Sequence, residues 1–385
     1  LADNGGPTLT FAPLPDSPAI DAGDNAQCPA TDQRGEARPQ DGNADGNARC
    51  DSGAYEVPFT MISPEITLGT LDYGSLANVT SDAQGNFRVI WANRNSVFIR
   101  RFSANGTEIG SLRTLPMPGS FGKSSIAGLN SGNMVIVWSG TASGFEGNGI
   151  FAQRFTSEGA LLGNIIQIAS TSSTAYLAVA MTNNGNFIAT WLGSAQSGDP
   201  QSIYVRRYAA DGTALGAADK INETLPQHTE SHVQIATDAV GNYVVAWQDT
   251  AWYGTPGNWG GVYAHVFAAD GTAKNGKITV GTFVVENAEY ATLGVGMDAV
   301  GNFVVTWSTQ DIASPNHEDA FARRFAANGQ PLSDPFMVHA TAQGVQRDPR
   351  IGMSAGGRFV IVWTGTDQDG GGIFAQLFEA DGRRS

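Results

Sequence analysis

The 385-residue sequence predicts an all-β protein built from one repeated unit. Six times, a Gly-Asn-aromatic turn or a close variant of it leads into alternating apolar residues and ends at a tryptophan, at positions 91, 138, 191, 247, 307 and 363. Self-similarity of this kind is typical of repeat architectures. The chain also contains 48 glycines and only 15% charged residues, a composition that suits short strands joined by tight turns.

Each unit is expected to contain four strands. In the fourth unit, alternation predicts the first three strands over residues 232–237, 243–247 and 261–267. An Asp-Gly or Asn-Gly pair follows the third strand in most units and supplies the positive φ angles of a hairpin, and a fourth strand comes after it. Six units of four antiparallel strands predict a six-bladed β-propeller. A row of separate β-sandwiches would need about seven strands per domain.

The ends of the array predict how the ring closes. The sixth unit reaches Asp381-Gly382 without a fourth strand, whereas the apolar segment 59–68 precedes the first unit and resembles the fourth strands of the others. We therefore expect a propeller over residues 57–385 in which 59–68 completes the last blade. Closure would remove the exposed sheet edges of an open array.

The repeated aromatic residues are expected to form the core between blades. They comprise the six tryptophans and the aromatic residues that end the third strands, namely Phe102, Phe155, Tyr208, Phe267, Phe325 and Phe378. Because they recur in every unit, a structural role is expected, and each contributes about 2–3 kcal/mol on burial.

Residues 1–56 differ in composition from the repeats. Cys28 and Cys50 flank a stretch rich in Gly, Asp, Asn and Pro that cannot build a core by itself. A disulfide between them would stabilise the segment by about 3 kcal/mol in the chain-entropy model. This predicts an oxidising, extracytoplasmic setting; two free thiols in a cytosolic protein are the alternative.

Two resemblances concern location. The motifs Asp16-Ser-Pro-Ala-Ile-Asp-Ala-Gly23 and Cys50-Asp-Ser-Gly-Ala-Tyr-Glu56 resemble the closing segment of bacterial right-handed parallel β-helix proteins of the polymorphic-outer-membrane-like kind. The repeats resemble the Gly-Asn-Phe-Val-Val-x-Trp repeats of large secreted bacterial surface proteins. These resemblances imply an extracellular or cell-surface protein, processed from a larger one, and imply no particular chemistry.

A calcium site is predicted inside the amino-terminal segment. Oxygen-bearing side chains alternate, with glycine at the sixth position, as in short Ca²⁺-binding loops. The twelfth position is Ser52 where such loops carry Glu, so Asp51 would have to substitute. The predicted ligands of a structural Ca²⁺ are Asp41, Asn43, Asp45, Asn47 and Asp51; a polar turn beside the disulfide is the alternative.

Ligand-binding residues are predicted at two places. The loop between the second and third strands of the fourth unit contains Trp252, Tyr253 and Trp259, which would hold a sugar ring or an apolar patch of a protein, or else cap the edge of the blade. The second place is the mouth of the central channel, where the first strands begin.

Two rows of residues define this mouth when the units are aligned on their turns. The positions nine before each turn glycine are Leu76, Lys123, Tyr176, His232, Thr292 and Asp348. The positions two earlier are Gly74, Phe121, Thr174, Glu230, Tyr290 and Gln346. Of these, Tyr176, His232, Tyr290 and Asp348 are the predicted ligand-binding residues. The alternation His228, Glu230, His232 could hold a metal, but a solvated turn is the alternative.

Charge and composition restrict the function. A formal charge of −14 without a Lys/Arg cluster argues against nucleic acid or an anionic membrane as partner. No apolar stretch is long enough for membrane insertion.

We expect a non-catalytic secreted or cell-surface module for binding or adhesion, with a glycan or surface protein as partner and no catalytic residues. One alternative is a structural subunit that self-associates into an extracellular assembly, with its amino-terminal stretch added to a neighbour's sheet. The second alternative is a polysaccharide-active enzyme, by analogy of fold. For that enzyme, Glu230 and Asp348 are the carboxylates that would face each other across about 5–9 Å.

Overall fold

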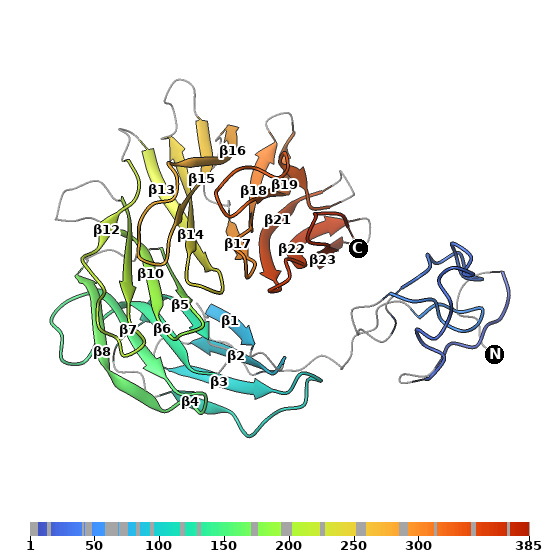
Figure 1. Ribbon diagram of the computed structural model, residues 1–385, viewed down its shortest axis with the longest axis horizontal. Helices are drawn as coiled ribbons and strands as arrows, with labels where there is room; N and C mark the ends of the chain where they lie inside the picture. Colours follow the sequence, from blue (N-terminus) through green and yellow to red (C-terminus); the bar gives the residue numbers. More distant parts are fainter. Residues whose placement is uncertain are drawn as a thin grey trace. The chain divides into compact units, whose positions relative to one another are not determined.

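The structure is a computed structural model (Figure 1). It describes residues 7–13, 17–40, 42, 48–57, 68, 76–81, 85–92, 96–115, 119, 121–128, 132–170, 176–193, 202–223, 228–251, 259–284, 292–311, 314–339, 344–367 and 370–384. Contacts divide the chain into two units, Leu1–Thr70 with Phe102–Ile109 and Leu71–Arg101 with Gly110–Ser385. In the described ranges no helix could cross a membrane.

The described strands form six antiparallel sheets, here called blades 1 to 6 in chain order. Blade 1 contains β1 (Leu76–Ser81), β2 (Phe87–Ala92), β3 (Val97–Phe102) and β4 (Arg113–Leu115). Blade 2 contains β5 (Phe121–Gly128), β6 (Met134–Gly140), β7 (Gly149–Phe155) and β8 (Leu161–Ser170). Blade 3 contains β9 (Leu177–Met181), β10 (Phe187–Gly193), β11 (Ser202–Tyr208) and β12 (Asp219–Lys220).

The second half of the chain repeats this order. Blade 4 contains β13 (His228–Thr237), β14 (Tyr243–Ala251), β15 (Trp259–Phe267) and β16 (Ile278–Val284). Blade 5 contains β17 (Leu293–Met297), β18 (Phe303–Asp311), β19 (Ser314–Phe325) and β20 (Phe336–Met337). Blade 6 contains β21 (Gln346–Met353), β22 (Phe359–Asp367) and β23 (Gly370–Phe378).

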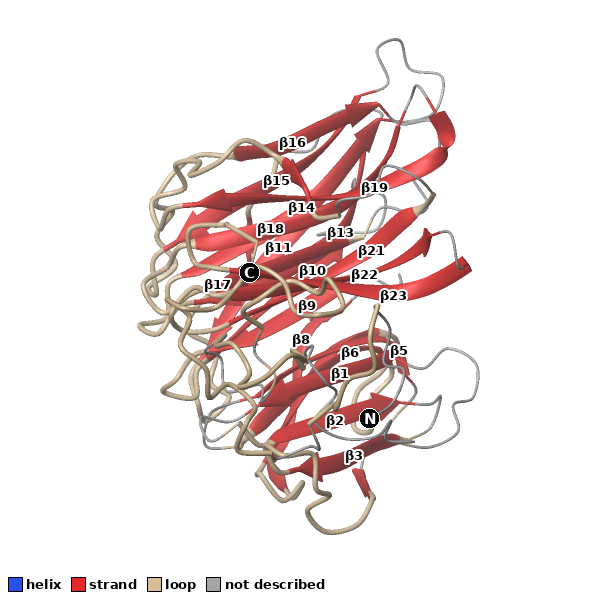
Figure 2. Cartoon of the chain, turned by 90° about the vertical axis from the view of Figure 1, so that its right-hand side faces the viewer, coloured by secondary structure: helices blue, strands red, loops and turns tan. Residues whose placement is uncertain are grey.

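The blades are arranged as in a propeller, which confirms the predicted six-bladed fold. Within each blade the strands pair with their neighbours in sequence. The first strands of consecutive blades lie against one another, from β1 and β5 through to β17 and β21, so they are the inner strands (Figures 1 and 2). The beginnings of these inner strands therefore lie at one end of the central channel.

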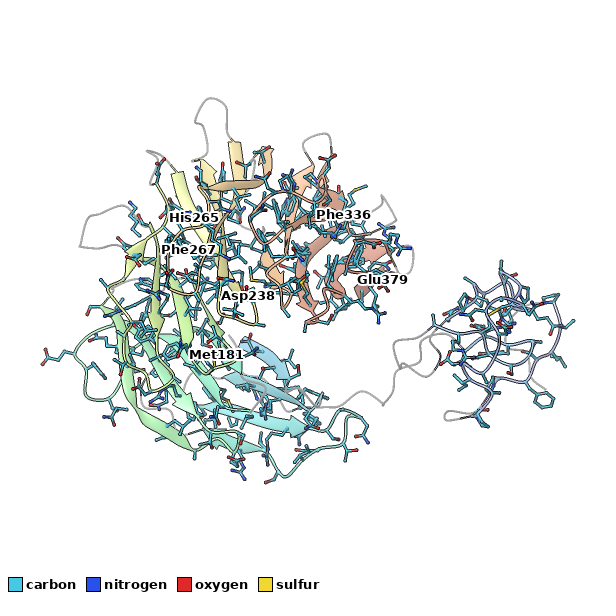
Figure 3. The ribbon with its side chains drawn as sticks, viewed as in Figure 1. Met181, Asp238, His265, Phe267, Phe336 and Glu379 are labelled. Carbon is cyan, nitrogen blue, oxygen red and sulfur yellow. A yellow bond between two sulfur atoms is a disulfide. The ribbon has the colours of Figure 1, made fainter. Side chains whose placement is uncertain are left out.

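The turns form for the local reasons that the sequence predicts. Gly241, in the turn between β13 and β14, has a φ of 95°, and Gly271, after β15, has a φ of 91°. These are left-handed conformations that glycine adopts without steric cost. Asp238 fixes the first of these turns, because its Oδ1 accepts hydrogen bonds from the backbone N–H groups of Val240 and Asn242 at 3.0 and 2.8 Å. Figure 3 shows Asp238 on the inner side of its blade.

The repeated aromatic residues are buried, as predicted. The six tryptophans are at most 7% exposed and the six aromatic residues that end the third strands at most 5%. In blades 3 to 6 the aromatic residue that begins the second strand stacks on the one that ends the third, with ring centroids 4.7–4.9 Å apart. Apolar clusters such as the one joining Val304 and Ala322 of blade 5 to Ile361 of blade 6 extend this core across the blade interfaces.

Arginines connect neighbouring blades at the residue before the terminal aromatic of the third strand. Arg207 of blade 3 donates from Nη1 to the backbone carbonyl of Ala269 in blade 4 at 3.1 Å. Arg154 makes the matching bond from blade 2 to blade 3, and Arg324 from blade 5 to blade 6. Between blades 4 and 5, Asn275 Nδ2 donates to the carbonyl of Asn328 at 3.1 Å. We call these bonds the blade clamps.

The amino-terminal residues contain the predicted disulfide between Cys28 and Cys50, with Cα atoms 6.4 Å apart. Buried carboxylates organise the backbone around it. Asp32 accepts hydrogen bonds from the backbone N–H groups of Arg34 and Glu56 at 2.7 and 2.9 Å. Burial by itself would raise the pKa of Asp32, but these hydrogen bonds and the Arg34 side chain outweigh it and lower the pKa to about 2.

Asp51, predicted as a calcium ligand, is 3% exposed. Its Oδ1 accepts from the backbone N–H of Asp21 at 2.8 Å and its Oδ2 from that of Val57 at 2.6 Å. Both carboxylate oxygens therefore already hold the backbone. The other four predicted ligands, Asp41, Asn43, Asp45 and Asn47, lie outside the described residues.

Candidate functional site

Three inner strands are interrupted by β-bulges at equivalent positions. The register with the second strand shifts between Phe121 and Ser124 in β5, between Ser231 and Gln234 in β13, and between Arg347 and Arg350 in β21. A bulge leaves residues out of the pairing ladder and redirects their side chains. The bulges contain Lys123, His232 and Asp348, which belong to the channel-mouth row predicted from the sequence.

Two of these residues have unusual backbones. His232 has a φ of 50° and Asp348 a φ of 58°. Residues with a Cβ atom rarely adopt this left-handed region, and doing so costs about 1–3 kcal/mol. Such strain is concentrated at functional sites, so these two positions direct attention to the channel mouth.

Aromatic and cationic side chains from three blades meet at this mouth. The rings of Tyr176 and His232 lie 4.5 Å apart, centroid to centroid. The Nζ atom of Lys123 lies 3.4 Å from the centroid of the Tyr176 ring, a cation–π contact. The hydroxyl of Ser139 in β6 accepts a hydrogen bond from the backbone N–H of Lys123 at 3.0 Å, which satisfies the backbone freed by the bulge.

His232 is uncharged at neutral pH in these surroundings. Burial, followed by the positive charges of Lys123 and Arg350, lowers the pKa of His232 to about 4. A hydrogen bond with Gln248 and the charge of Asp348 act in the opposite direction but are outweighed. The imidazole is therefore available as a neutral donor or acceptor.

Asp348 of blade 6 has an acidic neighbour in blade 5. Glu318 lies in β19, and its Oε2 is buried without a hydrogen-bond partner among the described residues. Burial raises the pKa of Glu318; the charge of Arg347 opposes this shift, and the charge of Asp348 adds to it. Asp348 therefore lies within electrostatic reach of Glu318, and the site of Glu318 favours its protonated form.

The carboxylate pairing expected from the sequence, Glu230 with Asp348, is wrong. Glu230 is 2% exposed and accepts a hydrogen bond from Asn222 Nδ2 at 2.5 Å. In the sheet it lies opposite Asp249, which is 5% exposed, so its carboxyl group is enclosed within the blade. Gln346, in the equivalent position of blade 6, is also 2% exposed and accepts from Trp363 Nε1 at 2.7 Å. These two members of the second row therefore lie buried in their blades.

The remaining predicted residues fall into two groups. Tyr176 and His232 are in ring contact and the charge of Asp348 acts on His232, whereas Trp252, Tyr253 and Tyr290 lie outside the described residues. Trp259 begins β15, and its side chain is outside the described set. The alternation His228, Glu230, His232 lies in β13 and not in a turn. In the described part of the chain, no three His, Cys, Asp or Glu side chains are grouped to hold a metal.

Sequence reasoning missed Glu318, Arg347 and Arg350. The arginines flank the bulge at Asp348, but nothing in an alternating strand pattern reveals a bulge. Glu318 belongs to a different blade, and only the packing of β19 beside β21 brings it near Asp348.

A cavity of about 450 Å³ lies on blade 2 beside Phe145, Gln153 and Leu161. Its lining contains no ionisable side chain, so it offers no acid–base chemistry. The channel mouth, where Lys123, His232 and Asp348 are presented by bulges, is the candidate active site.

No family model matches the chain, and no curated protein sequence matches it. Solved structures do share its fold. An α-L-arabinanase of Penicillium chrysogenum, in complex with arabinobiose, is 11% identical with a TM-score of 0.52, over 78% of this chain and 92% of that one. An α-L-arabinofuranosidase of Fusarium graminearum is 10% identical with a TM-score of 0.51, over 79% and 92%. A protein of unknown function from Dyadobacter fermentans is 12% identical with a TM-score of 0.50, over 78% and 92%.

These similarities correct the function expected from the sequence. The sequence led us to prefer a non-catalytic binding or adhesion module, with no catalytic residues, to an enzyme. This preference was wrong, because the similar structures of known activity are an arabinofuranosidase and an arabinanase, which are enzymes. The second alternative, a polysaccharide-active enzyme, is favoured instead. At identities of 10–12% the likeness establishes the fold alone.

Proposed function

We propose that this protein is a polysaccharide-active enzyme that hydrolyses glycosidic bonds at the channel mouth. The observation that carries the proposal is the pair Glu318 and Asp348, since burial and the charge of Asp348 both favour the protonated form of Glu318. Glycoside hydrolysis uses two carboxyl groups in different states, one that donates a proton and one that is ionised.

The roles follow from the surroundings of each group. Glu318 protonates the leaving glycosidic oxygen as general acid, because its site disfavours the charged form. Asp348 is presented by a bulge and acts on the other side of the sugar, either as nucleophile or as the base that activates water. The rings of Tyr176 and His232 offer an apolar surface for the sugar beside these carboxyl groups.

The fold supports the same class of substrate. The propellers of similar structure include an arabinofuranosidase and an arabinanase, the latter in complex with arabinobiose. Polysaccharides, including those containing arabinose, are therefore the first substrates to test. The disulfide supports action outside the cytoplasm, where such polymers are found and thiols are oxidised.

The test is release of reducing ends from a panel of plant and bacterial polysaccharides by the full chain. We expect Glu318→Gln and Asp348→Asn each to lower the rate by at least about 10³-fold, because each removes one of two groups that act together. Asp334 is an exposed acidic residue of blade 5, the blade of Glu318. Asp334→Asn is the control and should retain the wild-type rate.

Circular dichroism and thermal unfolding should show that all three variants are folded. Absence of activity on every polymer, or wild-type rates in both active-site variants, would refute the proposal.

A further inference from the structure

The channel mouth contains several positively charged side chains, although the chain as a whole is acidic. The chain has 36 acidic residues against 22 lysines and arginines. At the mouth, however, Lys123 and Arg350 are both close enough to His232 to lower its pKa, and Arg347 is close enough to Glu318 to oppose the rise in its pKa. Three cations therefore act on groups of the mouth, together with Asp348 and with Glu318, whose pKa is raised.

Within the described part of the chain, these three cations, Lys123, Arg347 and Arg350, form no ion pair. Arg350 donates from Nη1 to the backbone carbonyls of Pro349 at 3.2 Å and Leu293 at 3.5 Å, and the charge of Asp348 favours the charged form of Arg350. Lys123 rests on the face of Tyr176, with its Nζ 3.4 Å from the ring centroid.

Positive charges that face the same site attract an anion. The bulges at Lys123 and Asp348 interrupt the strand pairing and set where the backbone presents these two residues. An arginine and a lysine around a sugar-sized aromatic surface match a sugar that carries an acidic group.

We propose that the substrate is an anionic polysaccharide, whose acidic groups are bound by Lys123 and Arg350 while the sugar ring lies against Tyr176 and His232. That this polysaccharide is a substrate rests on the proposed hydrolytic function. That it is anionic is inferred from the geometry of the mouth. Carboxylate and sulfate groups share this chemistry, and the experiment separates them.

The experiment measures binding of the full-length Glu318→Gln variant by isothermal titration calorimetry. The ligands are oligomers of polygalacturonate, a sulfated dextran and a neutral arabinan. We expect one of the two anionic ligands to bind at least about tenfold more tightly than arabinan at low salt, with the difference reduced at about 0.3 M NaCl. The anionic ligand that binds more tightly identifies carboxylate or sulfate as the recognised group.

Two lysine variants in the same background give the matched comparison. Lys123→Met should weaken binding of the anionic ligand about tenfold. Lys277→Met removes the lysine whose Nζ lies 4.5 Å from the ring of Tyr263, a similar cation–π pair in blade 4, and should leave binding unchanged. Arabinan binding as tight as that of both anionic ligands, no binding of any ligand, or equal effects of the two variants would overturn the inference.

Failure of this inference is distinguishable from failure of the proposed function. One outcome is that the single variant Lys123→Met, without the change at Glu318, hydrolyses a neutral polymer at the wild-type rate. That result would leave the enzyme proposal standing and would reject the anionic substrate. Salt-dependent anion binding through Lys123, without hydrolysis of any polymer, would do the reverse.

Discussion

His232 shows how the fold alters the chemistry of a single residue. An ordinary histidine changes charge near pH 6.5, but burial and the charges of Lys123 and Arg350 lower the pKa of His232 to about 4. Between these two pH values the unfolded chain binds a proton that the folded chain does not. The contribution of His232 to stability is therefore present above about pH 6.5 and is lost as the pH falls through about 4.

NMR titration of the full chain tests this arrangement. We expect the His232 resonance, identified by its absence in His232→Gln, to report a neutral ring down to about pH 4. Lys123→Met should raise the titration midpoint, because it removes the nearest source of positive charge from beside the ring.

Lys277→Met is the control and should leave the midpoint unchanged. A midpoint that is ordinary in the wild type, or unaffected by loss of Lys123, would mean that Lys123 does not act on this ring.

At the scale of the element, the third strand serves two purposes. The aromatic residue at its end packs within the blade, and in blades 2, 3 and 5 the residue before it connects that blade to the next through a clamp. Sequence inspection identifies the aromatic residue by its repetition. The clamp is not apparent from sequence, because its acceptor is a backbone carbonyl in the following blade and Asn275 replaces the arginine in blade 4.

Arg207→Met tests the clamp between blades 3 and 4. We expect it to lower the free energy of unfolding by about 1 kcal/mol, since a charge-assisted hydrogen bond is lost at a partly exposed site. Hydrogen exchange should become faster in the turn 268–272 of blade 4.

Arg206→Met is the matched control. The Nε of Arg206 donates at 2.9 Å to the carbonyl of Gly216 within its own blade. Its removal should leave exchange in the blade 4 turn unchanged. Equal exchange in the two variants would show that the clamp does not couple the blades.

At the scale of the whole molecule, the last blade differs from the others. In blade 5, Ala320 and Ala322 are fully buried by the next blade. In blade 6, Ile373 takes the position of Ala320 and is 82% exposed. Leu377 takes the position of the clamp residue Arg324 and is 46% exposed. In the described part of blade 6, β23 is also the edge strand. This apolar edge is where the sequence predicts that residues 59–68 complete the ring, and nearly all of that segment lies outside the described residues.

Ile66→Pro in the full chain tests this closure. Proline removes a backbone donor and is poorly tolerated in a paired strand. If 59–68 pairs with β23, hydrogen exchange over 370–378 should become faster and the urea midpoint should fall. Thr70→Pro, just beyond the segment, is the control. Unchanged exchange in β23 would show that another part of the chain, or none, covers this edge.

The sequence by itself determined the repeat, the turns and the core. The Gly-Asn turns, the tryptophans and the terminal aromatic residues are short-range patterns, and the physics that places them, positive φ at glycine and burial of large rings, acts within one blade. The same alignment also identified Tyr176, His232 and Asp348 as equivalent positions at the channel mouth.

Only the tertiary structure decided which of these groups lie near one another. Glu230 is buried in its blade, where Asn222 donates a hydrogen bond to it. Glu318 lies within electrostatic reach of Asp348, although the two belong to different blades. The structure also revealed the bulges that present Lys123, His232 and Asp348. The physical reason is that bulges and burial depend on how strands and neighbouring blades pack. The alternation of apolar and polar residues along a strand does not determine that packing.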